Sequence, residues 1–318
     1  MKTIYLVLPC YNEELVITDS ISKLKDLMYS LMSNDKISNK SRVIFVDDGS
    51  NDKTWELLLN ACSEDKLFGA ISLAHNRGHQ NAILAGMMVS KDRCDAVITL
   101  DADLQHDISV IPQFIDKYEQ GYEIVYGVRK MRKGGAFKKY TGSLFYELMN
   151  LFGTEVIKNH ADYRLMSSKA LNALSYYEEV NLFLRGIIPQ IGFKSITLEY
   201  DEKPRLAGES KYSLKKMVKL ALDGITSFSI RPLQMILVCG VLFFVVSIIM
   251  LLFALITHMN GGTLSGWTSI VAPMWLIGGV QLLALGIIGE YIGKIYMETK
   301  HRPRYEIDKI ILDDDTAC

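Results

Sequence analysis

The sequence has no excess of charge of either sign and little means of cross-linking the chain. Its 318 residues carry 35 basic and 36 acidic side chains, for a net charge of −1. A broad nucleic-acid-binding surface needs a clear excess of lysine and arginine, so that function is excluded. The five cysteines form no Cys-x-x-Cys pair, which argues against a zinc site or a disulfide framework. Low-complexity stretches are missing and 49% of the residues are hydrophobic, so a disordered chain is excluded too.

Charged residues are also missing from one long segment. Between Arg231 and Glu290 there is no Asp, Glu, Lys or Arg, whereas a helix on a soluble core keeps a polar stripe. A polar, glycine-rich turn at 258–266 divides the segment into runs of about 233–257 and 268–292. Each run exceeds the roughly 20 residues that cross a bilayer. We therefore predict a transmembrane hairpin within 232–293; the alternative is a buried helical hairpin in a soluble core.

Basic residues flank this hairpin on both sides but are missing from its turn. They are Lys211, Lys215, Lys216, Lys219 and Arg231 before it, and Lys294, Lys300, Arg302 and Arg304 after it. Segments rich in Lys and Arg next to membrane spans stay on the cytoplasmic side. We therefore expect a multi-pass protein of the cytoplasmic (inner) membrane with both termini in the cytoplasm. A domain of residues 1–210 precedes the hairpin, and a tail of residues 294–318 follows it. Residues 211–231 are expected to form an amphipathic helix at the lipid headgroups, or alternatively one packed on the domain.

Short apolar runs alternate with helical patterns in the first 200 residues. The strand-like runs are 4–8, 43–46, 70–73, 97–100 and 124–126, and the helical patterns are 13–31, 54–61, 80–89 and 111–118. This alternation predicts an α/β fold whose mostly parallel sheet carries helices on both faces. Ligands of such sheets bind beyond the carboxyl ends of the strands.

The residues after the strands are polar and rich in carboxylates. They form the segments Pro9–Glu13, Asp47–Ser50, His75–Gly78 and Asp101–Gln105. Each segment alone could be a turn or a helix cap, but clustered carboxylates repel one another unless a cation is present. If Asp101 and Asp103 lie in an extended segment, their side chains point the same way and share a hard cation. Mg²⁺ or Mn²⁺ prefers such oxygen ligands, and Gln105 offers a third.

These ordered motifs, with the later Arg205–Tyr212 element, resemble an inverting family 2 glycosyltransferase of the Rossmann-like GT-A fold. The resemblance is to the branch of polyprenyl-phosphate glycosyltransferases, and it covers nearly the whole chain apart from the last dozen residues. It implies a UDP-sugar donor, a polyprenyl phosphate acceptor such as undecaprenyl phosphate, the lipid bilayer as partner, and a homo-oligomer such as a tetramer.

The resemblance also implies a role for each matching residue. The nucleotide sugar would be bound by Pro9, Tyr11, Asn12, Glu13, Asp48, Asn76, Gly78, Asp101 and Arg129. The metal would be bound by Asp103 and Gln105 with Asp101. The acceptor phosphate would be approached by Arg129, Arg164, Arg205, Ser210 and Lys211. Asp101, Asp103, Asp162 and Arg205 would form the catalytic set.

Asp162 and the pair His75 and His79 each allow more than one interpretation. Asp162 could orient the acceptor or stabilise positive charge on the sugar, or it could be a plain ion-pair partner of Arg164 or a helix cap. His75 and His79 have the i, i+4 spacing of a zinc pair, but without a third ligand nearby we expect histidines at the rim of the substrate site.

Two other functions compete with lipid glycosylation. A polysaccharide synthase of the same fold usually carries Gln-x-x-Arg-Trp, and none of Trp55, Trp267 and Trp275 stands in that context. A non-catalytic membrane scaffold would not need the intact aspartates. The resemblance to bactoprenol-type enzymes implies a UDP-sugar donor, with glucose or N-acetylglucosamine expected as the sugar, although no residue discriminates between the sugars.

Overall fold

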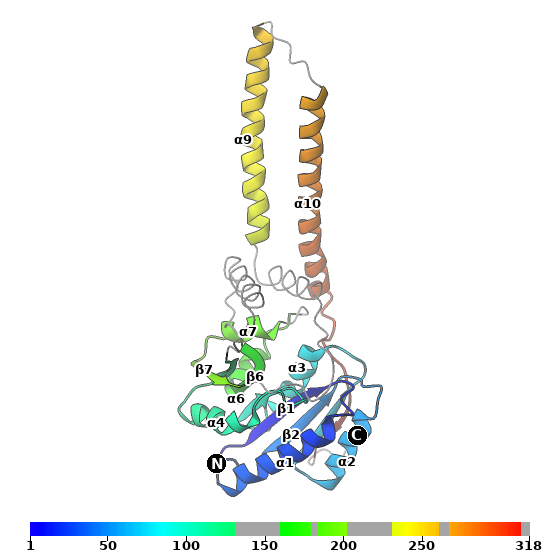
Figure 1. Cartoon of the computed structure of the whole chain (residues 1–318), viewed down its shortest axis with the longest axis vertical. Coiled ribbons are helices and arrows are strands. Elements are labelled where there is room, and N and C mark those ends of the chain that lie inside the picture. The colour runs from blue at the N-terminus through cyan, green and yellow to red at the C-terminus, as the bar shows by residue number, and fades with distance from the viewer. Residues whose placement is uncertain (131–159, 180–182, 202–230, 261–266, 313–318) are drawn as a thin grey trace. The chain divides into compact units, whose positions relative to one another are not determined.

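The computed structural model describes residues 1–130, 160–179, 183–201, 231–260 and 267–312 (Figure 1). The chain divides into two compact units. One contains a β-sheet with its helices and includes residues from both ends of the chain, and the other contains two long helices. The expected helix at 211–231, apart from Arg231, lies outside the described residues, as do Arg205, Ser210 and Lys211.

The sheet unit alternates strands and helices as the sequence predicts. Its strands are β1 (Ile4–Cys10), β2 (Arg42–Asp47), β3 (Phe68–Leu73), β4 (Ala96–Thr99), β5 (Ile124–Arg129), β6 (His160–Ser167), β7 (Ser195–Tyr200) and β8 (Ile307–Ile311). Its helices are α1 (Ile17–Ser33), α2 (Thr54–Glu64), α3 (His79–Ser90), the short 3₁₀ helix η1 (Ile108–Val110), α4 (Ile111–Glu119), α6 (Ser168–Leu174) and α7 (Leu184–Gln190).

The eight strands form one mixed sheet in the order β7-β5-β6-β4-β1-β2-β3-β8. Strands β4, β1, β2 and β3 are parallel to one another, so their carboxyl ends lie along one edge. Strand β6 runs antiparallel to β4 and β5, and β8 runs antiparallel to β3. The α/β fold class with a mostly parallel sheet is therefore confirmed.

Helices cover both faces of this sheet. On one face Leu24 of α1, Leu58 of α2 and Phe114 of α4 share a buried core with Leu6 and Phe45. Side chains alternate along a strand, so Val7 and Val46 point to the other face, where α3 packs. A Cβ atom added at Gly86 of α3 would lie 2.7 Å from Val46 Cγ2 and closer still to Val7. Glycine at this position lets the helix lie close to the sheet.

The end of the chain differs from the expected tail. Residues 307–311 form β8, which pairs with β3 and completes the sheet edge. This strand was not predicted because it is only five residues long and its apolar and charged residues do not alternate. The sheet domain is consequently built from chain on both sides of the long helices.

The second unit contains α9 (Arg231–Met259) and α10 (Trp267–Thr299), which contact each other. In the described part of the chain, one stretch is long and apolar enough to cross a membrane: Ile277–Thr299, with a mean hydropathy of 1.3. A shorter apolar stretch, Pro232–Phe243, lies in α9. Leu282 is 72% exposed and Leu237 67%, so neither side chain is covered by the described residues. The two-span hairpin remains a prediction.

Candidate active site

The loops that follow β1, β2 and β3 are tied together at the carboxyl edge of the sheet. Asn12 N donates to Ser50 Oγ at 3.0 Å, and the Asn12 side-chain oxygen accepts from Asn51 N at 2.9 Å. These bonds hold Asn12 at a φ of 54°, a left-handed conformation that asparagine adopts more readily than most residues. The first loop is therefore fixed on the second.

Asp48 fixes the second loop on the third. Its carboxylate accepts from Arg77 N at 2.7 Å and Gly78 N at 2.8 Å, and the residue is 2% exposed. Burial raises the pKa of Asp48, and the two backbone hydrogen bonds oppose that rise. Asp48 faces this backbone and positions the loop before α3, and its implied role at the nucleoside stays a prediction.

Gly49 allows the same two loops to approach. Residues with a side chain rarely adopt a φ of +69°, the value at Gly49. A Cβ atom added to Gly49 would lie 2.9 Å from Asn76 N. Any larger residue would push the β3 loop away. Asn76 is held against the β2 loop by this close packing.

These loops and β8 enclose a cleft of about 460 Å³, named here the β3–β8 cleft. It is lined by Tyr11, Asp47, Gly49, Ser50, Asn51, Trp55, Ser72, Leu73, Ala74, His75, Asn76, Asp308 and Lys309. Burial raises the pKa of Asp47, against the hydrogen bond that its carboxylate accepts from Ser50. The cleft thus combines two aromatic side chains with a buried carboxylate and amide groups, a set that can stack on and hydrogen-bond to a flat heterocycle.

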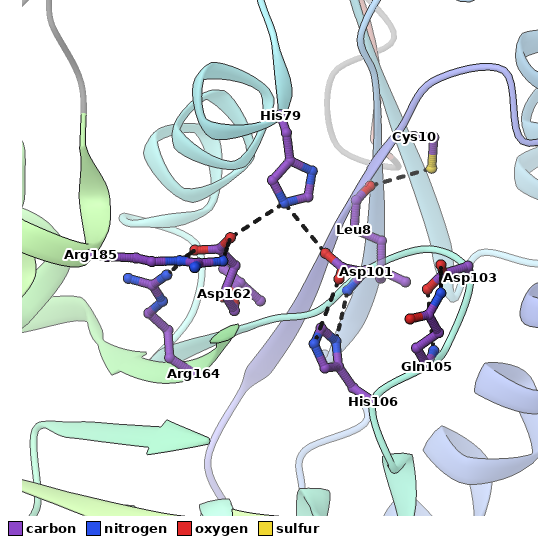
Figure 2. A network of polar contacts seen from close by, with 11 residues as sticks. Leu8, Cys10, His79, Asp101, Asp103, Gln105, His106, Asp162, Arg164 and Arg185 are labelled. Atoms are coloured by element: carbon purple, nitrogen blue, oxygen red, sulfur yellow. Dashed lines mark hydrogen bonds and ion pairs between the residues drawn. The ribbon is translucent and has the colours of Figure 1, made fainter. Parts of the chain in front are cut away.

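A charged cluster lies at the end of β4 and the start of β6 (Figure 2). We define it as His79, Asp101, Asp162, Arg164 and Arg185. Asp162 is 6% exposed and lies between two arginines: Arg185 Nη2 is 2.9 Å from its Oδ2, and Arg164 Nη2 donates to its Oδ1. Burial alone would raise the pKa of Asp162, but His79 and both arginines hold it well below the usual value. Asp162 is therefore an ionised partner of arginine, and the interpretation as an ion pair is the observed one.

His79, the first residue of α3, joins the two aspartates of this cluster. Its Nε2 lies 3.4 Å from Asp101 Oδ1 and 3.7 Å from Asp162 Oδ2. Burial would lower the pKa of His79, but the neighbouring carboxylates of Asp162 and Asp101 outweigh it, so the pKa is raised. His79 is 46% exposed at its side chain where it meets the cluster, and His75 lines the cleft, so both are exposed histidines as expected.

His106 supports Asp101 from the other side. It is 1% exposed, stacks on Tyr163 at a centroid distance of 5.0 Å, and meets the edge of Tyr200. Its Nδ1 accepts from Asp101 N at 3.3 Å, while its Nε2 lies 3.6 Å from Asp101 Oδ2. Burial lowers the pKa of His106, so the ring is neutral and acts as a wall behind Asp101.

Asp101 and Asp103 lie in a turn, which corrects the extended segment assumed from the sequence. Leu104 N donates to Asp101 O at 3.2 Å, and Leu104 has a φ of 48°. The chain turns here because β4 ends at Thr99 and η1 begins at Ile108. Asp101 consequently faces the two histidines, whereas Asp103 Oδ2 accepts from Gln105 Nε2 at 2.6 Å (Figure 2).

The donor set at this turn fits a hard cation that a ligand also coordinates. Asp101 Oδ1 is buried and makes no hydrogen bond within the described part of the chain. Asp103 and Gln105 bring further oxygen atoms two and four residues on. Over the same residues, no group of three or more His, Cys, Asp or Glu side chains is arranged around a metal position. Two carboxylates and an amide suit a cation whose remaining ligands are phosphate oxygens.

The remaining site residues from the sequence fall into three groups. Tyr11 and Asn76 line the β3–β8 cleft, while Pro9 is buried within β1 and Gly78 caps α3. Glu13 N donates to Thr54 Oγ1 at 2.9 Å. Arg129 ends β5, is exposed, and donates to Tyr200 Oη at 3.3 Å. Arg164 is 1% exposed against Asp162, so it does not face an incoming phosphate as the resemblance implied.

Several site residues were missed because their positions depend on distant parts of the chain. Arg185 was missed although the sequence contained one signal: it is a charged residue between Leu184 and Gly186 at the start of the otherwise largely apolar helix α7. The motif Asp47–Ser50 was recognised, but the nucleoside-binding role was assigned to Asp48, whereas it is Asp47 that lines the cleft. Trp55, Asp308 and Lys309 come together only because α2 and β8 meet the β3 loop.

Comparison with known proteins places these features in context. The family model described as Glycosyl transferase family 2 matches residues 5–181. An uncharacterised glycosyltransferase of Bacillus subtilis (strain 168), YkoT, is 48% identical over 95% of this chain and 90% of its own length. A bactoprenol glucosyl transferase of Shigella phage SfV is 36% identical over 96% of this chain and 97% of its own length.

One solved structure aligns with most of this chain at lower sequence identity. A mannosyltransferase from Pyrobaculum calidifontis, PcManGT, was solved in complex with GDP-Man and Mn²⁺. It is 14% identical, covers 93% of this chain and 84% of its own, and has a TM-score of 0.48.

Proposed function

The chain belongs to glycosyl transferase family 2, and we propose that it moves a sugar from a nucleotide sugar to a polyprenyl phosphate in the membrane. UDP-glucose and UDP-N-acetylglucosamine are the proposed donors, and undecaprenyl phosphate is the proposed acceptor. Support for the lipid acceptor comes from the near full-length match to a bactoprenol glucosyl transferase. The observation that carries the proposal is the pairing of the β3–β8 cleft with the charged cluster on one edge of the sheet.

The cleft suits the nucleoside of the donor. Tyr11, 42% exposed, offers a ring for stacking, and Asp47 offers a carboxylate that can accept a ring N–H of uracil. Asp48 and Gly49 hold the loops that form this wall. The pyrophosphate then extends along the edge towards Asp101, since β4 and β3 are separated by β1 and β2.

Asp101, Asp103 and Gln105 would hold a Mg²⁺ or Mn²⁺ ion at the pyrophosphate. When bound, the ion neutralises the charge that the leaving nucleoside diphosphate acquires. Within the chain, Asp101 is fixed by His106 behind it and by His79 at its free face. His79 also reaches Asp162, so it keeps two like charges from repelling each other.

The acceptor needs charge compensation more than a base. A phosphate monoester is already anionic near neutral pH, so its oxygen attacks the anomeric carbon directly, which inverts an α-linked donor to a β-linked product. Bringing that anion to the donor requires arginine, whose fork matches phosphate oxygens. Arg185, 35% exposed at its side chain, and Arg129 are the described arginines proposed for this role, with Arg205, Ser210 and Lys211 as further candidates. Asp162 orients Arg185 and does not act as the base.

Chain connectivity supports an even number of membrane crossings. Strand β7 precedes the long helices, β8 follows them, and both strands belong to one sheet. If α10 crosses the bilayer, the chain must cross once more to return to that sheet. Helix α9 is the proposed second crossing, which gives spans of about 233–257 and 268–292 with the sheet domain and both termini in the cytoplasm.

The test uses membranes that contain the full-length protein. With undecaprenyl phosphate and radiolabelled UDP-glucose or UDP-N-acetylglucosamine, we expect a labelled product that partitions into chloroform. Asp103→Ala should abolish the label, whereas Asp92→Ala, at an exposed position outside the site, should preserve it. Label only in a water-soluble polymer would point to a polysaccharide synthase, and no turnover with any nucleotide sugar would point to a scaffold.

A further inference from the structure

Strand β8 contains a β-bulge beside the cleft. Ser72 of β3 pairs with Lys309, but the next residue, Leu73, pairs with Ile307, which leaves Asp308 as an extra residue in β8. Neighbouring side chains on a regular strand point to opposite faces. Both Asp308 and Lys309 nevertheless line the cleft, because a bulge turns the strand and redirects a side chain.

Lys309 brings a positive charge to this wall of the cleft. Its side chain is 62% exposed, and its Nζ lies 4.0 Å from Asp308 Oδ2. That separation is an ion pair at the limit of contact and not a hydrogen bond. The ammonium group therefore keeps its donors for a ligand in the cleft, where Tyr11, Asp47 and Asn76 stand on the other walls.

The position of β8 in the sheet decides which part of a donor can reach Lys309. Strands are about 4.8 Å apart, and β8 is four positions from β4, so on the order of 19 Å separates β8 from the strand that leads to Asp101. A donor whose pyrophosphate lies at Asp101 presents its base, and not its phosphates, to β8.

We propose that Lys309, positioned by the bulge at Asp308, donates a hydrogen bond to a carbonyl oxygen of the donor's base. The proposal rests on the nucleotide-sugar function above. Lys309 lies outside the part of the chain that the family model matches, residues 5–181. The segment after the long helices thereby completes the nucleotide site. Without β8, the sheet domain would lack the side of the cleft that contacts the nucleobase.

The test measures binding of UMP and UDP to the purified full-length protein by calorimetry. Lys309→Met should weaken both ligands by about tenfold, the size of a hydrogen bond to a charged donor, and by the same factor for each because the base is common to both. Lys309→Arg should retain most of the affinity. Ile310→Thr, on the same strand but not in the lining of the cleft, should bind as wild type.

Each other outcome has a defined meaning. A loss confined to UDP would place Lys309 at the phosphates and overturn the proposal. Equal affinities of wild type and Lys309→Met, with wild-type binding intact, would overturn it while the glycosyltransferase function stands. If the wild-type protein binds neither UDP nor GDP, the donor assignment fails and this inference fails with it. Melting temperatures of the variants should match wild type, since the Lys309 side chain is largely exposed.

Discussion

The guanidinium of Arg185 lies with its Nη2 2.9 Å from Oδ2 of Asp162, on the open side of a carboxylate whose other side faces buried Arg164. The two arginines differ in what they can do. Arg164 is 1% exposed, and its Nε and Nη1 make no hydrogen bond within the described residues, so its charge depends on Asp162. Arg185 is partly exposed and can contact a ligand while Asp162 holds it in place.

We expect Asp162→Leu to destabilise the protein by about 3 to 5 kcal/mol. Removing one partner of a buried ion pair leaves the other charge without compensation, and Arg164 is almost fully buried. Thermal unfolding of the detergent-solubilised full-length protein measures the change. Asp19→Asn is the matched control, because the Asp19–Lys23 pair is solvent-exposed and should contribute little. Equal melting temperatures of the two variants would show that the Asp162–Arg164 pair does not stabilise the fold.

Acid should remove the contribution of Asp162 in a defined pH window. Burial would raise its pKa, but His79 and the arginines hold it well below the usual value. The group therefore stabilises the fold fully above the unfolded-state pKa of about 3.9, and this stability is lost as the pH falls towards the folded-state pKa. Asp162 also raises the pKa of His79, so the comparison is made below the ordinary His pKa of about 6.5. The difference in melting temperature between wild type and Asp162→Asn should stay constant from about pH 6 to 5 and shrink below pH 4. A difference that shrinks between about pH 6 and 5 would contradict this assignment.

Gly49→Ala should weaken UDP binding while leaving a folded protein. An added Cβ meets Asn76 N at 2.9 Å, so the β3 loop must move away from the cleft. Gly121→Ala is the matched control: Gly121 has a similar φ of +84°, but no atom lies within 4 Å of its added Cβ. Both variants place alanine at a positive φ and so strain the backbone, but only Gly49→Ala displaces the β3 loop that lines the cleft. Calorimetric titration with UDP should show reduced affinity for Gly49→Ala alone; an equal reduction in both variants would attribute the effect to strain.

Local patterns predicted the sheet and the loops that carry the site, because alternation and turn residues act over a few positions. Strands β1 to β5 and helices α1 to α4 were expected within a few residues of their observed bounds. Strand β6, which carries Asp162 and Arg164, was not expected, although polar and apolar side chains alternate along His160–Leu165.

Long-range pairing explains what the sequence could not predict. The extended Asp101–Asp103 segment was assumed from spacing, whereas the turn depends on how β4 meets η1 and where His106 is buried. The place of Arg185 depends on α7 packing near β6, and that of Lys309 on β8 returning to β3. None of these pairings leaves a periodic signal in the sequence.

Chelation should stop the reaction while the nucleoside stays bound. Asp101, Asp103 and Gln105 are proposed to hold the divalent ion at the pyrophosphate, and the cleft that seats the base is several strands away. With EDTA we expect transfer from UDP-sugar to undecaprenyl phosphate to cease, and added Mg²⁺ or Mn²⁺ to restore it. UMP, which lacks the pyrophosphate, should bind with nearly unchanged affinity. Full activity in excess EDTA would contradict the metal proposal.

The turn between α9 and α10 should be exposed on the outer side of the membrane. The sheet contains chain from before and after the two helices, so an even number of crossings is required, and basic residues flank both outer ends of the hairpin. Thr263→Cys should therefore react with a membrane-impermeant maleimide in intact cells. The wild-type chain is the control: its thiols at Cys10, Cys62 and Cys94 belong to the sheet domain and should stay unlabelled until the cells are permeabilised. Labelling of wild type in intact cells, or protection of Thr263→Cys, would contradict the two-span arrangement, because a single crossing cannot return β8 to the sheet that β7 leaves.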